Sequence, residues 1–102
     1  MDFKKIEHSV YIIKCSDDTV YTGYAKNLYK RLTQHNEKKG AKYTKGRTPI
    51  TLLYFEEFSN RSYAQKKECE IKKLKRIEKE NYIKENLTQE KEKIILKINE
   101  NL

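Results

Sequence analysis

Residues 9–24, SVYIIKCSDDTVYTGY, contain two short tyrosine-bearing runs separated by a polar segment. The runs Val10–Cys15 and Val20–Tyr24 are rich in β-branched and aromatic residues, which favour strands. The SDDT segment between them has the composition of a turn. The stretch therefore predicts a β-hairpin, and it leaves open whether Tyr11 and Tyr21 are ordinary sheet residues or belong to a functional site.

The register of this hairpin decides whether the two tyrosines can act together. Side chains alternate between the faces of a strand, so a shift of one residue moves a side chain to the other face. Tyr11 and Tyr21 share a face if Cys15 pairs with Tyr21 and Ile13 with Gly23, and Gly23 then leaves space beside them. This arrangement requires a three- or five-residue connection, or a bulge, rather than a two-residue turn.

The middle of the chain predicts a helix, a loop and a third strand. Asn27 is a suitable cap for a helix that runs to about Asn36. Glu37–Pro49 has the composition of a loop. Ile50–Phe58, ITLLYFEEF, is apolar enough to be a central strand with the hairpin at its edges.

Two more helices are expected after this strand. The first starts at a cap on Ser59 or Asn60, with Ser62-x-x-Gln65 resembling a capping box, and runs to about Leu74. The second covers Ile77–Asn86. The predicted order is thus β-β-α-β-α-α, and the fold class is α+β, with a small three-stranded antiparallel sheet flanked by helices.

The length of 102 residues fits one compact domain. We assign residues 1–86 to this domain and residues 87–102 to a C-terminal amphipathic helix or frayed tail, in which Ile94 and Ile98 fit one face. No apolar run reaches the roughly 20 residues of a membrane span, and the N-terminus does not have the composition of a signal peptide. We therefore expect a cytoplasmic protein that does not enter a membrane.

The formal net charge of +8 is concentrated in two segments. Residues 26–47 contain eight Lys or Arg against one Glu, and residues 61–79 contain eight against three. A positive face of this kind suits a polyanion such as DNA or RNA, although a Lys-rich solvated surface has the same composition.

The cysteines do not predict a metal site. Cys15 and Cys69 lie far apart in the sequence, form no Cys-x-x-Cys motif and are accompanied by two well-separated histidines. In a reducing compartment we expect both to be buried thiols.

The predicted elements bring five chemically capable residues close together. Two lie on the hairpin, two stand four positions apart on the first helix, and one carboxylate interrupts the apolar stripe Ala64, Glu68, Ile71, Lys75. Each alone has an ordinary structural interpretation, but a buried carboxylate needs a partner or a metal. Together they form a plausible phosphodiester-cleaving set: Tyr11, Tyr21, Arg31, His35 and Glu68.

The ordered set resembles the GIY-YIG nucleases, a family named for tripeptides in its first two strands. Ser9-Val10-Tyr11 and Tyr21-Thr22-Gly23 stand in their places, AKNLYKRLTQH resembles the first helix, and AQKKECEIKK resembles the segment of the metal-binding glutamate. The resemblance covers residues 8–85, and the Lys39–Arg47 loop is similar to that of small stand-alone bacterial members. Ser-Val replaces Gly-Ile in the first tripeptide, and Thr22 replaces Ile in the second.

The resemblance implies hydrolysis of a nucleic-acid phosphodiester with one divalent metal, Mg²⁺ or Mn²⁺. Glu68 would hold the metal, and Arg31 would hold the scissile phosphate through its planar guanidinium. Tyr11 is favoured as the base, with His35 as its hydrogen-bond partner. Tyr21 and His35 stay open as alternative bases, and a tyrosine needs a lowered pKa for this role.

The basic segments would supply substrate binding. Tyr43 would stack on a base, and the other residues would contact phosphates. None of them indicates base-specific readout, so we expect an endonuclease that is selective for DNA structure or dependent on a protein partner. The predicted nucleic-acid-binding residues are Lys26, Lys30, Lys42, Tyr43, Lys45, Arg47 and Lys72.

The candidate substrate is DNA, including single-stranded and branched forms, with RNA not excluded and DNA repair as a candidate pathway. Two rival functions are a catalytically weak nucleic-acid-binding module of the same fold and a plain interaction module with a solvated Lys surface. The retained glutamate and arginine favour an active nuclease over both.

Overall fold

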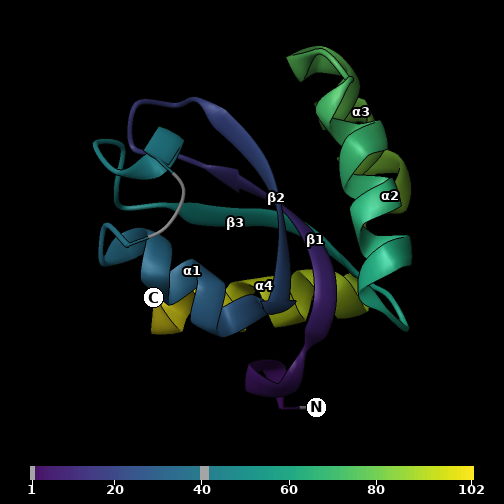
Figure 1. The fold of residues 1–102 in the computed structure, drawn as a ribbon, viewed down its shortest axis with the longest axis horizontal. Coiled ribbons are helices and arrows are strands. Elements are labelled where there is room, and N and C mark those ends of the chain that lie inside the picture. The colour runs from purple at the N-terminus through teal and green to yellow at the C-terminus, as the bar shows by residue number, and fades with distance from the viewer. Residues whose placement is uncertain (1, 40–41) are drawn as a thin grey trace.

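The computed structural model describes residues 2–39 and 42–102 (Figure 1). Its strands are β1 (Glu7–Lys14), β2 (Val20–Asn27) and β3 (Thr51–Glu57). Its helices are α1 (Leu28–Asn36), α2 (Arg61–Lys72), α3 (Arg76–Asn86) and α4 (Gln89–Asn101), with short 3₁₀ turns at Phe3–Lys5 and Lys42–Thr44. The predicted α+β class and β-β-α-β-α-α order are confirmed, with α4 following. Among the described helices, none combines the length and apolar character that crossing a membrane requires.

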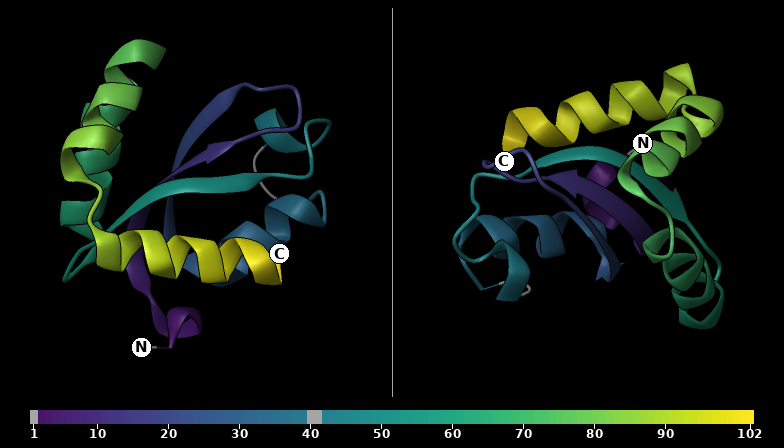
Figure 2. Two further views of the ribbon diagram at one scale, coloured as in Figure 1. Left: turned by 180° about the vertical axis from the view of Figure 1, so that it is seen from behind. Right: turned by 90° about the horizontal axis from the view of Figure 1, so that it is seen from above.

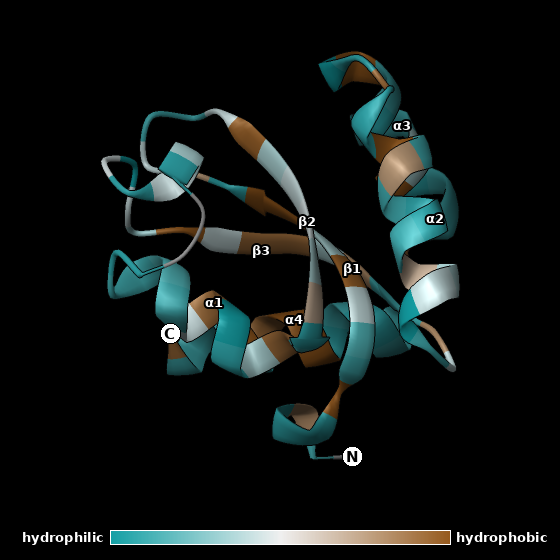
Figure 3. Ribbon diagram, in the orientation of Figure 1, coloured by the Kyte–Doolittle hydropathy of each residue, from teal (hydrophilic) through white to brown (hydrophobic). Residues whose placement is uncertain are grey.

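The sheet is antiparallel with the order β2-β1-β3, so β1 is the central strand. The prediction that residues 50–58 form the central strand is therefore wrong. Leu52, Tyr54 and Phe55 are buried because helices cover both faces of the sheet at this edge, not because β3 has strands on both sides. Figure 3 shows hydrophobic residues along much of β3.

The hairpin register places Tyr11 opposite Gly23 and Ile13 opposite Tyr21. The predicted pairing of Ile13 with Gly23 is therefore wrong by two residues. A shift of two keeps every side chain on its own face, so Tyr11 and Tyr21 still share one. Residues 15–19 make the five-residue connection that a shared face requires.

Helices cover the two faces of the sheet. α1 and α4 pack on the face that carries Tyr11, and Ile98 of α4 is fully buried there. α2 packs Ala64 and Ile71 against the opposite face, which carries Ile12. Both views of Figure 2 show α4 running alongside β3.

A shared carboxylate connects α3 to the sheet. The hydroxyls of Tyr54 in β3 and Tyr82 in α3 both donate hydrogen bonds to Glu56 Oε1. Lys91 Nζ of α4 donates to the Tyr54 hydroxyl at 3.1 Å. This polar network joins β3, α3 and α4 on one side of the sheet.

Helix caps explain where α1 and α2 begin. Asn27 Oδ1 accepts from the Lys30 backbone N–H at 3.0 Å, as predicted. Asn60 Oδ1 accepts from the Tyr63 backbone N–H at 3.0 Å and caps α2. The proposed capping box at Ser62 is wrong, because Ser62 already lies inside the helix.

Two expectations about buried residues near α2 are wrong. Cys15 is buried, but Cys69 is exposed because Ala64 and Ile71 carry the inward face of the helix. Lys75 lies beyond the end of α2, at the cap of α3, so it does not continue that stripe.

Residues 89–101 form a docked helix. The Asn99 side chain accepts from the Leu52 backbone N–H at 2.8 Å and donates to the Leu52 carbonyl at 3.0 Å. Tyr29 Oη of α1 donates to the Asn101 carbonyl at 2.9 Å. These contacts attach α4 to both β3 and α1, while the division of the chain at residue 86 stays a prediction.

Removing a buried side chain of α4 should therefore destabilise the whole fold. We expect Ile98→Ala to lower the free energy of unfolding by about 2–5 kcal/mol, because it leaves a cavity in the core. Leu96→Ala on the same helix is the control, since Leu96 is 61% exposed and should change stability by no more than about 0.5 kcal/mol. Urea denaturation followed by circular dichroism measures both, and equal effects would show that α4 does not contribute to the core.

Candidate active site

A buried tyrosine–histidine pair lies between β1 and α1. Tyr11 Oη is 2.7 Å from His35 Nε2, and the two side chains are 1% and 0% exposed. His35 Nδ1 is in turn 2.7 Å from Thr44 Oγ1 in the loop before β3. This chain of contacts fixes the orientation of both rings.

Gly23 makes room for the Tyr11 ring. A Cβ atom at position 23 would lie 2.6 Å from Tyr11 Cζ and closer still to its hydroxyl. Any residue other than glycine would therefore push the ring away from His35. The space that the sequence predicted beside the tyrosines is occupied by Tyr11 itself.

Burial controls the protonation of the pair. It raises the pKa of Tyr11, and the Arg31 guanidinium opposes this shift while the Glu68 carboxylate adds to it. It lowers the pKa of His35 to about 4, with the Arg31 charge as a second cause. Tyr11 is therefore a neutral phenol and His35 a neutral imidazole near pH 7, so the tyrosine can donate to Nε2.

Tyr21 lies at the open side of the pair. Its ring centroid is 6.4 Å from that of Tyr11 and 5.8 Å from that of His35. Its other neighbours are the Tyr43 ring, stacked at 5.5 Å, and Lys72 Nζ, 6.0 Å from its centroid. Tyr21 is only partly buried, so it can meet a substrate directly.

Arg31 and Glu68 reach this site from opposite faces of the sheet. Arg31 projects from α1, and Glu68 lies on α2, where its Oε2 is 3.1 Å from Lys72 Nζ. Both charges act on the Tyr11 phenol. Both helices contact the edge strand β2, and Lys72 links Glu68 to Tyr21, so all five predicted residues lie around this strand.

The residues predicted to bind nucleic acid are distributed around this site. Lys26 and Lys30 lie beside Arg31, near the end of β2 and the start of α1. Lys42 and Lys45 are exposed in the loop before β3. Lys72 lies next to Tyr21.

Tyr43 and Arg47 form a stack at the site's rim. The Arg47 guanidinium carbon is 4.3 Å from the Tyr43 ring centroid, and the same guanidinium is 2.9 Å from Asp17 Oδ2. Tyr43 therefore already contacts both Tyr21 and Arg47. A base that stacks on Tyr43 has to use its exposed part or displace Arg47.

Thr44 was not among the predicted site residues. It is buried, and it contacts His35 through its hydroxyl. Nothing in its spacing from His35 could have shown this, because the contact depends on the path of the loop before β3.

The donor set is compatible with one hard divalent cation. Among the described residues, no group of three or more His, Cys, Asp or Glu side chains could hold a metal. Mg²⁺ retains several waters and is held by one or two carboxylates, so Glu68 alone is a sufficient protein ligand. Its ion pair with Lys72 would have to open for the carboxylate to hold a cation.

Gly23→Ala tests the close approach of Tyr11. We expect it to lower the free energy of unfolding by about 1–3 kcal/mol, because the new methyl group overlaps the phenol ring. Gly46→Ala is the control, since nothing lies within 4 Å of a Cβ there and the change should be near neutral. Thermal and urea unfolding compare the two, and an unaffected Gly23→Ala would contradict the geometry.

The lowered pKa of His35 predicts a pH-dependent stability. Between pH 6.5 and about 4 the unfolded chain binds a proton at this residue and the folded chain does not, so stability falls as the pH falls. By about pH 5 the loss should reach roughly 2 kcal/mol. Urea unfolding of wild type and His35→Gln at pH 7 and about pH 5 checks this, and an identical pH dependence would contradict it.

Comparison with known proteins gives consistent matches. The model of the GIY-YIG catalytic domain matches residues 7–93. A UPF0213 protein from Natronomonas pharaonis is 46% identical over 77 residues, which are 76% of this chain and 91% of the relative. A UPF0213 protein from Staphylococcus haemolyticus is 49% identical over 79 residues, 78% of this chain and 96% of the relative.

Two solution NMR structures are also similar. The UPF0213 protein from Bacillus halodurans is 37% identical, with a TM-score of 0.53 over 82% of this chain and 89% of its own. A protein from E. faecalis is 41% identical, with a TM-score of 0.55 over 79% of this chain and 86% of its own. With the family model matching most of its length, this chain belongs to the GIY-YIG family, whose domain is of the nuclease type.

Proposed function

We propose that this protein is a metal-dependent endonuclease that hydrolyses DNA phosphodiester bonds. The observation that supports the proposal is the buried Tyr11–His35 hydrogen bond, with the Arg31 and Glu68 charges both acting on the Tyr11 phenol. A guanidinium, a carboxylate and a hydrogen-bonded phenol supply the functions that phosphodiester hydrolysis needs.

Arg31 would bind the scissile phosphate. It is partly exposed, and its contact from Nη1 to Gln34 Oε1, at 3.5 Å, is long and weak. A phosphate would offer it a bidentate, charge-assisted partner in place of this contact. The bound guanidinium would then stabilise the charge that develops on phosphorus oxygens in the transition state.

Tyr11 and His35 would handle the proton of the attacking water. A base role for Tyr11 needs a lowered pKa, and burial raises it in the protein alone. The 2.7 Å contact between Tyr11 Oη and His35 Nε2 removes this requirement. Tyr11 can accept a proton from water while it transfers its own proton to neutral His35. Tyr21, on the open side, would orient the water.

Glu68 would hold Mg²⁺ or Mn²⁺. A cation bound there supplies positive charge that stabilises the transition state and favours deprotonation of neighbouring groups. Lys72, released from Glu68, would be free to contact a substrate phosphate.

Specificity would come from the structure of the DNA or from a partner protein. The lysines around the site contact phosphates, which carry no sequence information. We therefore propose single-stranded or branched DNA as substrates to examine first, with RNA as a comparison. A role in DNA repair and a location in the cytoplasm stay predictions from the sequence.

Cleavage of labelled single-stranded, duplex and branched DNA, with Mg²⁺ or EDTA, tests the proposal. We expect metal-dependent cutting that falls by about 10²–10³-fold in Glu68→Gln, the size of loss seen when a transition-state stabilising group is removed. Glu70→Gln is the control, because Glu70 lies on the same helix with its side chain 55% exposed and pairs with Lys67.

The other outcomes identify the rival functions. Binding without cutting would support the catalytically weak nucleic-acid-binding module, for which the paired state of Glu68 and the raised pKa of Tyr11 are the favourable observations. If the protein neither binds nor cuts DNA at moderate salt, the plain interaction module is the remaining function. Equal loss in Glu68→Gln and Glu70→Gln would show that Glu68 has no special role.

A further inference from the structure

The free edge of β2 forms the rim of the candidate active site. Within the described residues β2 pairs with β1 alone, and in Figure 1 it lies between α1 and α2. Tyr21 lies near the start of this strand, and Gly23 lies near its middle. A hollow opens at each of its two ends.

The first hollow lies where β2 leads into α1. It has a volume of about 430 Å³, and its described lining includes three basic residues, Lys26, Lys30 and Arg31, and one acid, Glu7. Gln34 adds an amide from α1. Because Arg31 also belongs to the active site, this α1 hollow continues directly from it.

The second hollow lies at the start of β2, between the hairpin turn, the Tyr43 loop and α3. It has a volume of about 280 Å³, and the described residues that line it, none of them acidic, are Thr19, Val20, Tyr43, Leu74, Arg76 and Lys79. We call it the α3 hollow. It lies on the opposite side of Tyr21 from the α1 hollow.

Lys79 is the unneutralised charge of the α3 hollow. Arg76 is already paired with Asp18 and Glu80. The Lys79 ammonium has no ion pair in the part of the chain that the structure describes, although the side chain is partly buried. Burial and the neighbouring Lys72 charge both lower its pKa. An anion in the hollow would compensate this partly desolvated ammonium.

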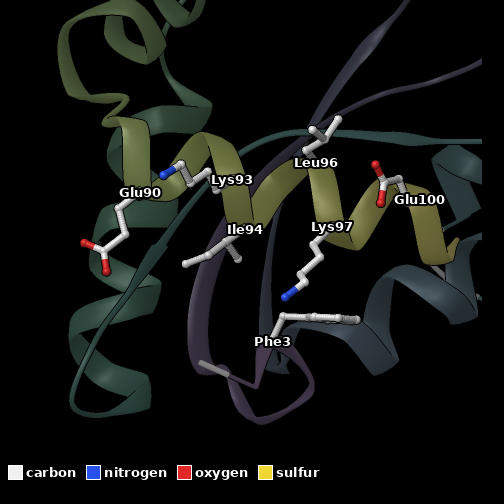
Figure 4. A pocket seen from close by; sticks show the side chains of 7 residues that line it. All are labelled: Phe3, Glu90, Lys93, Ile94, Leu96, Lys97 and Glu100. Atoms are coloured by element: carbon white, nitrogen blue, oxygen red, sulfur yellow. The ribbon is translucent and has the colours of Figure 1, made fainter.

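A third hollow provides a contrast. It has about the same volume, 280 Å³, and lies between α4 and Phe3 (Figure 4). Its charged lining is balanced, with Lys93 and Lys97 against Glu90 and Glu100. It therefore lacks the excess positive charge that marks the two hollows along β2.

The two hollows are spaced for a short stretch of nucleic acid. From Val20 to Lys26 the strand rises about 20 Å, at about 3.3 Å per residue. At about 3.4 Å per stacked nucleotide, this length corresponds to roughly six nucleotides. A strand lying along β2 would pass Tyr21 next to the α3 hollow and Arg31 in the α1 hollow, with its remaining phosphates between them.

We infer that a nucleic-acid strand of about six nucleotides follows the edge strand β2, with flanking phosphates bound by Lys26 and Lys30 in the α1 hollow and by Lys79 in the α3 hollow. This inference rests on the proposed nuclease function for its substrate class. It adds Lys79, which lies outside the residues expected from the sequence, and it assigns the two hollows to opposite sides of the cleavage site.

Binding of fluorescent oligonucleotides to Glu68→Gln protein tests the path without cleavage. Lys30→Gln and Lys79→Gln are added singly and together, and Lys84→Gln on exposed α3 surface is the control. Each hollow variant should weaken binding and reduce the slope of log affinity against log salt by about 0.7, the value for one phosphate on a single strand. Affinity should rise with length up to about six nucleotides and then level off.

The outcomes separate this inference from the proposed function. If the wild type cuts DNA but Lys30→Gln and Lys79→Gln match Lys84→Gln in salt slope and KM, the path is wrong and the function stands. If the wild type does not cut but both variants lose one phosphate contact, the path stands and the function fails. Absence of binding by the wild type overturns both. Circular dichroism of each variant confirms that it is folded.

Discussion

The hydrogen bond between Tyr11 and His35 joins the centre of the sheet to the first helix. Its 2.7 Å length, in a site where both side chains are almost fully buried, leaves little freedom for either ring. Gly23 has to lack a side chain because Tyr11 lies over it, and Thr44 has to reach His35 from the loop. A buried polar pair is costly unless every partner is in place, so this contact constrains the strand, the helix and the loop together.

The position of the site at an edge strand follows from the same constraint. β1 carries Tyr11 in the centre of the sheet, where it is protected from water. β2 is the edge strand beside β1, and α1 and α2 contact it from opposite faces of the sheet. α1 brings Arg31 and α2 brings Glu68 to this edge. The centre of the sheet therefore holds Tyr11 in place, and the edge strand leaves the site open to a substrate.

Several parts of this arrangement could be predicted from the sequence, because they depend on local periodicity. Alternation along the hairpin made the shared face of Tyr11 and Tyr21 depend on the register, and the structure has a register of the required parity, although the considered pairing of Ile13 differs from it by two residues. An error of two residues in the register does not change which face of the sheet each side chain occupies, because side chains alternate with a period of two. The cap at Asn27 was confirmed for the same local reason.

The features that could not be predicted depend on tertiary packing. An apolar strand such as β3 is compatible with a central or an edge position. At the edge its apolar side chains are buried because helices cover both faces of the sheet there. The exposure of Cys69 follows from how α2 is rotated against the sheet. Thr44 and the hollow around Lys79 are formed by segments that are distant in the sequence. Even Thr22, in place of the family's isoleucine, has a consequence visible only in three dimensions, because within the described structure its buried hydroxyl has no hydrogen-bond partner.

The charged side chains of the candidate site are paired with protein groups that a metal ion or a phosphate could replace. Glu68 is neutralised by Lys72, and Arg47 by Asp17, while burial keeps Tyr11 and His35 uncharged. In the proposed reaction, a cation would take the place of Lys72 at Glu68, and a phosphate would receive the displaced ammonium. Each of these substitutions replaces one opposite-charge contact with another, so no charge is left buried without a partner. Substrate and metal would then be bound most favourably together, because each supplies the partner that the other displaces.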